Sequence, residues 1–179
     1  MAKSTDNMIL KINNKTILNA LRDLFVNAFV AVLIIALYSF IFDEKPPFIL
    51  YLSILIFFII LYLYPTLDIF YSYYWHDQNV LIDIDSEGFL YTKGNESKHY
   101  YKKDFREIKI YLTAYKKNNE NARLAHTKFF YVEIIMLDET KIILTSLLSC
   151  DLYDALIKMY EDIPVSFIIT QYTKLKKAN

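Results

Sequence analysis

The chain has 179 residues, of which 55% are hydrophobic and 17% aromatic, and only two are glycines. This length suits one ordinary domain with a small addition and disfavours two soluble domains. The hydrophobic share favours membrane residence, and the scarcity of glycine disfavours an active site built on a glycine-rich loop. Acidic and basic residues balance at 20 each, so no net charge attracts a nucleic acid polymer.

Two uncharged apolar runs follow a polar N-terminal segment, residues 1–23. The first extends from Leu24 to Phe42, about 28 Å of helix, which is close to the hydrocarbon thickness of a bilayer. The second extends from Phe48 to Tyr64 and can lengthen past Pro65 to residue 69. The intervening DEKPP, residues 43–47, is long enough only to turn the chain. The sequence therefore predicts a transmembrane helical hairpin over residues 24–69.

The distribution of basic residues predicts the orientation of this hairpin. Four of them precede the first run: Lys3, Lys11, Lys15 and Arg22. Lys45 alone lies in the turn, so the positive-inside rule places the N-terminus in the cytoplasm. The hairpin returns the chain to the same side, and a single cysteine fits that reducing compartment. We expect a multi-pass membrane protein with both termini cytoplasmic.

Five aromatic rings follow the second run in the stretch FYSYYWHD, residues 70–77. They belong to Phe70, Tyr71, Tyr73, Tyr74 and Trp75. Tyrosine and tryptophan favour the head-group layer, and the five rings point in too many helical directions to form one ligand-facing stripe. We expect an aromatic junction at the membrane interface.

The region after residue 77 alternates apolar and polar residues, which predicts β-strands. Such segments lie at 80–85, 89–92, 98–103, 105–115, 128–137 and 141–146, with a polar loop at 116–126. Residues 151–163 have helical spacing, and the apolar segment 165–170 suits a last strand. We expect an α+β membrane protein, in which the hairpin precedes an antiparallel sheet or barrel of about six to seven strands with a C-terminal amphipathic helix. This domain would span 78–172, followed by a tail at 173–179, of which KLKKAN, residues 174–179, is expected to be frayed.

Two segments in this order of elements carry a family resemblance. DFREIKI, residues 104–110, begins a long strand, and KIILTSLL, residues 141–148, precedes the helix. With the two spans before them, these segments resemble bacterial pleckstrin-homology-like (PH-like) membrane proteins of the YcxB-like kind, over residues 20–163. The resemblance implies a PH-like domain at a bacterial inner membrane, and some relatives are linked to resistance against membrane-active bacteriocins. The apolar segment after the helix departs from the simplest version of this fold.

Candidate catalytic residues are sparse. The histidines His76, His99 and His126 lack metal-ligand spacing, and the sequence contains no glycine-rich phosphate loop or nucleophile elbow. Cys150 precedes the predicted helix, whose N-terminus would lower the thiol pKa, but its leucine neighbours favour an inert thiol. We expect no enzymatic activity, no metal and no cofactor.

Basic residues are the main candidates for binding. Eight of them flank the third strand and the long loop: Lys98, Lys102, Lys103, Arg106, Lys116, Lys117, Arg123 and Lys128. Beside an anionic leaflet each would contribute roughly 1 kcal/mol, and the same residues suit an acidic protein or a phosphorylated ligand. The simpler alternative is a solvated face, because acidic residues are interleaved with them.

Two functional hypotheses follow. The first is a non-enzymatic membrane protein whose cytoplasmic domain binds a protein partner, a lipid or a second copy of itself. The second comes from another resemblance, to the two-span, β-rich effectors of cyclic-nucleotide antiphage systems. It implies that nucleotide binding makes the spans assemble and disrupt the membrane, with basic and aromatic residues holding the ligand.

Overall fold

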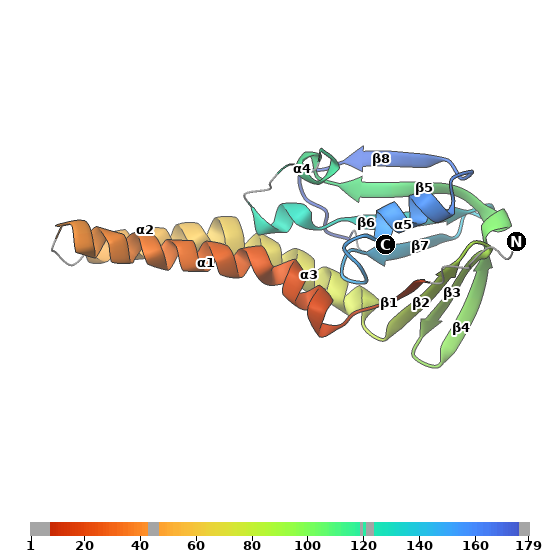
Figure 1. The fold of residues 1–179 in the computed structure, drawn as a ribbon, viewed down its shortest axis with the longest axis horizontal. Helices are drawn as coiled ribbons and strands as arrows, with labels where there is room; N and C mark the ends of the chain where they lie inside the picture. The colour runs from red at the N-terminus through yellow and green to blue at the C-terminus, as the bar shows by residue number, and fades with distance from the viewer. Residues whose placement is uncertain (1–7, 43–46, 119, 121–123, 176–179) are drawn as a thin grey trace, which may run out of the picture.

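A long helical hairpin projects from a β-rich domain in the computed structural model, which describes residues 8–42, 47–118, 120 and 124–175 (Figure 1). The first arm is α1 (Asn14–Phe42). The second arm is continuous and contains α2 (Phe48–Phe58), the π-helical η1 (Ile59–Leu63) and α3 (Tyr64–Asp77). Lys3 and Lys45, which entered the orientation prediction, lie outside the described residues.

The two arms are long and apolar enough to cross a membrane. Their large apolar side chains are largely exposed, as at Phe29 (67%), Phe40 (84%) and Phe57 (60%). Core helices of soluble proteins bury such side chains, and exposed apolar surface of this extent is costly in water. The hairpin therefore requires an apolar environment or an apolar partner.

The strands of the described residues form two four-stranded sheets. The first has the order β1 (Met8–Lys11), β2 (Val80–Asp85), β3 (Gly88–Lys93) and β4 (Glu96–Tyr101). The second has the order β7 (Lys141–Thr145), β6 (Tyr131–Met136), β5 (Phe105–Leu112) and β8 (Val165–Ile169). The short helices are η2 (Lys102–Asp104), α4 (Ala114–Lys117), η3 (Ala125–Lys128) and α5 (Leu152–Met159).

Strand β1 was not predicted from the sequence. It precedes the hairpin and pairs antiparallel with β2, Leu10 opposite Ile82, so residues 8–11 belong to the sheet and not to a separate N-terminal segment. The hairpin is thus inserted between two paired strands of one domain. Residues 8–11 are too few for their alternation of apolar and polar side chains to identify a strand. Their partner β2 is also separated from them in sequence by the whole hairpin.

The direction of strand β8 differs from the prediction that all strands of the sheet are antiparallel. An antiparallel arrangement was expected throughout, but β8 pairs parallel with β5, with Ile110 opposite Phe167. Helix α5 supplies the crossover that a parallel pair needs. The two sheets are not joined into one closed barrel among the described residues.

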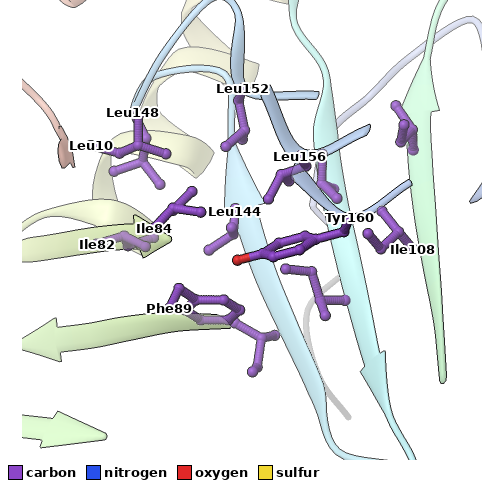
Figure 2. Packing of buried hydrophobic residues seen from close by; sticks show 14 of the residues in the cluster. Leu10, Ile82, Ile84, Phe89, Ile108, Leu144, Leu148, Leu152, Leu156 and Tyr160 are labelled. Carbon is purple, nitrogen blue, oxygen red and sulfur yellow. The ribbon is translucent and has the colours of Figure 1, made fainter. Parts of the chain in front are cut away.

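The main core lies between the two sheets and beneath α5 (Figure 2). Leu10, Ile82 and Phe89 from the first sheet meet Ile108 and Leu144 from the second. From the end of α5, the Tyr160 ring reaches across this space. Its hydroxyl donates a hydrogen bond to the carbonyl oxygen of Gly88 at 2.5 Å, which links the helix to β3.

A second cluster fastens the hairpin to the domain. Ile69, Phe70 and Tyr73 of α3 pack against Phe129, Tyr131 and Leu147. Because side chains alternate along a strand, Tyr131 faces α3 while Val132 faces the main core. The buried carboxylate of Asp77, at the end of α3, accepts a hydrogen bond from Thr145 of β7 at 2.5 Å. The second arm therefore enters the domain as a rigid, packed element.

The segment after β8 also returns to α3. Thr173 is buried and donates its hydroxyl to the carbonyl of Phe129, while its own carbonyl accepts from the Tyr73 hydroxyl. Lys174 forms an ion pair with Asp68 at 2.7 Å. The prediction of a frayed end is therefore wrong for Lys174 and Leu175, since Leu175 also packs against the second cluster, and residues 176–179 lie outside the described residues.

The two glycines give a matched test of this fold. Gly88 has φ +150°, and a Cβ there would lie 2.0 Å from the carbonyl oxygen of Tyr100, whereas Gly94 has φ +61° and faces open space. We expect Gly88→Ala to lower the free energy of unfolding by about 3 kcal/mol or more through this clash. Gly94→Ala should cost about 1 kcal/mol, from backbone strain alone. Thermal unfolding in detergent checks both, and equal losses would contradict the close approach at Gly88.

Candidate functional site

A pocket of about 390 Å³ lies between the first turns of α1 and the adjoining end of the β domain. Helix α1 contributes Thr16, Asn19 and Arg22, and α4 contributes Lys116. Lys128, at the end of η3, lines it as well. The pocket is therefore shared between the hairpin and the domain, and any movement of one against the other changes its shape.

Local capping orients the helical wall of this pocket. The Asn13 side chain accepts from the Thr16 backbone N–H at 3.0 Å, and the Thr16 hydroxyl accepts from the Asn13 N–H at 3.0 Å. This reciprocal pair follows the capping-box pattern, which satisfies two N–H groups at the start of a helix. It sets where α1 begins and presents Asn19 and Arg22 to the pocket.

The short helix α4 positions Lys116 in the pocket. Thr113 caps this helix by accepting the Lys116 N–H at 3.2 Å, and its hydroxyl donates to the carbonyl oxygen of Thr127 at 2.6 Å. The Lys116 ammonium lies 5.3 Å from the centre of the Phe130 ring and 5.5 Å from that of Tyr153. These are cation–π contacts. Among the salt bridges of the described residues, none involves Lys116.

Asp23 partly neutralises the other two cations of the pocket. Lys128 forms an ion pair with Asp23, and the Arg22 guanidinium lies 3.3 Å from the same carboxylate. Glu120 is the one acidic side chain in the pocket lining among the described residues, and its carboxylate accepts from the Asn118 amide at 2.9 Å. Among the described residues, three cations of the pocket thus stand against these two carboxylates, and Lys116 is the cation that has no ion pair there.

The eight predicted basic residues do not form one site. Lys116 and Lys128 line the pocket, near the hairpin. Lys117 is adjacent but lies over the Phe167 ring at 5.5 Å and does not line it. Arg123 lies outside the described residues.

Four of the eight lie at the opposite end of β5, away from the hairpin (Figure 1). They are Lys98, Lys102, Lys103 and Arg106. An eight-residue strand is about 25 Å long, so one small ligand cannot reach both groups. Lys102 is paired with Asp162, whose pKa it lowers, and Arg106 is paired with Glu139. Lys98 and Lys103 lie over Tyr100 and Tyr101.

The comparison with known proteins identifies the domain. A family model described as a PH domain matches residues 10–154, most of the chain. The chain belongs to the PH-domain family. The match begins at Leu10 in β1, continues across the hairpin and ends in α5. No curated protein and no solved structure matches the chain.

The five aromatic rings at the junction divide between two roles in this PH domain. Tyr73 is fully buried and Phe70 nearly so, both against the outer side of the second sheet, so the interfacial assignment is wrong for these two. Tyr71 (53% exposed) and Trp75 (66%) point outward, and Tyr74 is half-buried. Docking of α3 on the domain separates the rings, and the sequence pattern carried no sign of that contact.

His76 and His99 have ordinary structural surroundings, whereas the Nδ1 atom of His126 is buried without a hydrogen-bond partner among the described residues. A ring nitrogen of His76 lies 3.1 Å from the carbonyl oxygen of Ile143, and the His99 ring packs on Tyr101. His126 is half-buried, and burial lowers its pKa, which favours the neutral ring. Within the described part of the chain, no cluster of three or more His, Cys, Asp or Glu side chains suits a metal ion.

Cys150 lies in the lining of the pocket and is exposed. The sequence suggested that a helix N-terminus lowers its pKa, but desolvation by burial, followed by the nearby charge of Asp151, raises the thiol pKa. The thiol is therefore mostly protonated at neutral pH and weakly nucleophilic. This agrees with the interpretation of an inert thiol.

The raised pKa predicts how Cys150 reacts. Because the thiolate is the nucleophile and the pKa lies above its ordinary range, the alkylation rate should rise about tenfold per pH unit between pH 7 and pH 8.5. Labelling with N-ethylmaleimide in detergent, followed by mass spectrometry, measures the rate, with glutathione as a reference thiol. Cys150 is the only cysteine, so the signal is specific. A rate already constant above pH 7 would contradict the raised pKa.

Proposed function

We propose that this protein is a membrane-anchored, non-catalytic binding module of the YcxB-like kind, whose PH domain holds a protein or lipid partner at the cytoplasmic face of a bacterial inner membrane. The observation that supports it most is the insertion of the apolar hairpin between β1 and β2 of the domain. A domain fastened to both arms stays at a set distance from the bilayer, which suits recognition at the membrane surface. The physiological role would be protection against membrane-active bacteriocins or related stress.

The contacts of the two arms support this proposal. Helix α3 is packed against the domain by Ile69, Phe70 and Tyr73, and α1 is tied to η3 through the ion pair of Asp23 with Lys128. The exposed Tyr71 and Trp75 then suit the head-group layer, as rings with a polar edge do. Anchoring the PH domain and orienting it at the membrane require no catalytic group.

A second candidate is the nucleotide-gated effector, and one observation favours it. The pocket is lined by α1 and by the domain together, so a ligand bound there contacts the helix that leads into the membrane. Its size falls in the range of small-molecule sites, about 300–1,000 Å³. In this mechanism, ligand binding would change how the hairpins of several copies assemble.

The proposed location predicts where Cys150 can be labelled. A membrane-impermeant maleimide should label Cys150 in inverted membrane vesicles and not in intact spheroplasts, because the domain would face the cytoplasm. Gel shift of the full-length protein after denaturing quench measures the labelled fraction. The protein should also stay in the pellet after alkaline carbonate extraction. Labelling from the outside, or release by carbonate, would contradict the proposed arrangement.

Expression in bacteria separates the two candidates. For a binding module, we expect cells overexpressing the protein to exclude propidium iodide, with or without a co-expressed cyclic-nucleotide synthase. The control is a variant in which the outward-facing apolar residues of α1 are interrupted by Phe29→Lys and Val32→Lys, so that it does not insert. Dye entry that depends on both the synthase and an intact hairpin would favour the effector and contradict the binding module.

A further inference from the structure

We propose that the carboxyl group of Asp77 is a proton-binding site that controls how firmly the second arm of the hairpin is held against the β domain. The site lies at the joint, where α3 ends and β2 begins. The proton is a ligand outside the proposed function, and its site does not depend on which partner the PH domain binds.

The second arm enters the domain at the end of α3 (Figure 1). Asp77 is the last residue of α3, and only Gln78 and Asn79 separate it from Val80, the first residue of β2. Asn79 has φ +61°, a left-handed conformation that asparagine tolerates better than most residues, so the chain turns sharply there. Because the connection has only two residues, movement of α3 at Asp77 displaces the second arm relative to the first sheet.

The Asp77 carboxylate is buried at the junction of α3 with both sheets. Its side chain is 1% exposed, and it accepts a hydrogen bond from the Thr145 hydroxyl of β7 at 2.5 Å. From the first sheet, Lys93 of β3 donates to the carbonyl oxygen of His76 at 3.2 Å. A charged carboxylate in such a place carries a desolvation cost that a hydroxyl donor offsets only in part. The charge of Asp77 therefore weakens the contact of α3 with the domain.

The ionisable groups that face Asp77 come from α3 and β3. On α3, the His76 Nε2 lies 3.8 Å from the carboxylate, and the Tyr73 phenol is the other neighbour. On β3, Lys93 and Tyr91 interact with Asp77 electrostatically, while β7 contributes a neutral hydroxyl. Burial raises the pKa of both phenols, so they stay neutral at physiological pH.

Burial has the largest effect on the carboxyl group itself. Desolvation raises the pKa of Asp77 to about 6, against the opposing effects of the Thr145 hydrogen bond and of His76 and Lys93. An aspartate in an unfolded chain has a pKa of about 4. The docked joint therefore binds the proton more tightly than the opened joint, so protonation stabilises docking. This stabilisation is complete below about pH 4 and is lost as the pH rises through about 6.

Hydrogen exchange of the full-length protein in detergent, measured by mass spectrometry between pH 5 and pH 8, tests the proposal. Protection factors, which correct for the intrinsic pH dependence of exchange, are compared for the joint segments 73–80 and 143–147 and for α5, which packs on the main core. Asp77→Asn keeps the size of the side chain and an oxygen acceptor but stays neutral, as the protonated carboxyl group does. His76→Gln is the control, because histidine side chains ordinarily change charge in this pH range.

We expect the joint to be more protected in Asp77→Asn than in the wild type at high pH. With pKa values of about 4 and about 6, the ratio of the two protection factors should rise about tenfold from pH 5 to pH 8. In the His76→Gln background, Asp77→Asn should give a rise at least as large, because the imidazole opposes the raised pKa. The same ratio for α5 should change less than about twofold, since the joint opens locally.

Thr145→Val keeps the test possible if Asp77→Asn does not fold. It removes the hydroxyl that donates to Asp77, and a hydrogen bond to a charged carboxylate is stronger than one to a neutral carboxyl group. The loss of joint protection should therefore be larger at pH 8 than at pH 5. Equal losses at the two pH values would contradict the proposal.

Three further outcomes would overturn it. A ratio of joint protection factors that is constant from pH 5 to pH 8 would show that Asp77 binds no proton in this range. Disappearance of the rise in the His76→Gln background would assign the titration to His76. An equal rise in α5 would show that Asp77 acts on the stability of the whole domain and not on the docking of the second arm.

Discussion

The pairing of β1 with β2 is the constraint on which the rest of the structure depends. Met8–Lys11 must lie beside Leu81–Ile84, so the chain leaves the sheet at one strand and must return to the neighbouring strand. Paired strands are about 5 Å apart. The long apolar segment between β1 and β2 must therefore form a hairpin whose two ends are both attached to the domain. A tether attached through one flexible end would permit neither the packing of α3 nor the shared pocket.

The packing at the base of the hairpin follows from that closure. Once α3 is held beside the second sheet, Phe70 and Tyr73 can bury against Tyr131 and Leu147, and the buried Asp77 can accept from Thr145. The residues after β8 complete the contact through Thr173 and the ion pair of Lys174. Each contact is modest in energy, but together they align the helices with the domain.

The eight basic residues predicted as binding residues do not form one surface in the structure. The sequence placed eight basic residues in one candidate set, but β5 separates four of them from the pocket. The two lysines of the pocket also differ in their surroundings, because Lys128 forms an ion pair with Asp23 while Lys116 makes cation–π contacts with aromatic rings. Thr16, Asn19 and Ser146 were absent from the predicted set, since nothing in their local sequence places them beside Lys116.

The sequence by itself determined the features that depend on local composition and periodicity. These are the two apolar helices, the strand segments that form β2, β3, β6 and β7, and the amphipathic helix α5. Only the tertiary structure decided that β1 joins the sheet, that β8 runs parallel to β5, and that Tyr73 is buried while Trp75 is exposed. Periodicity reports which side of an element is apolar, but not which distant element covers it. These outcomes were set by contacts between segments far apart in the chain.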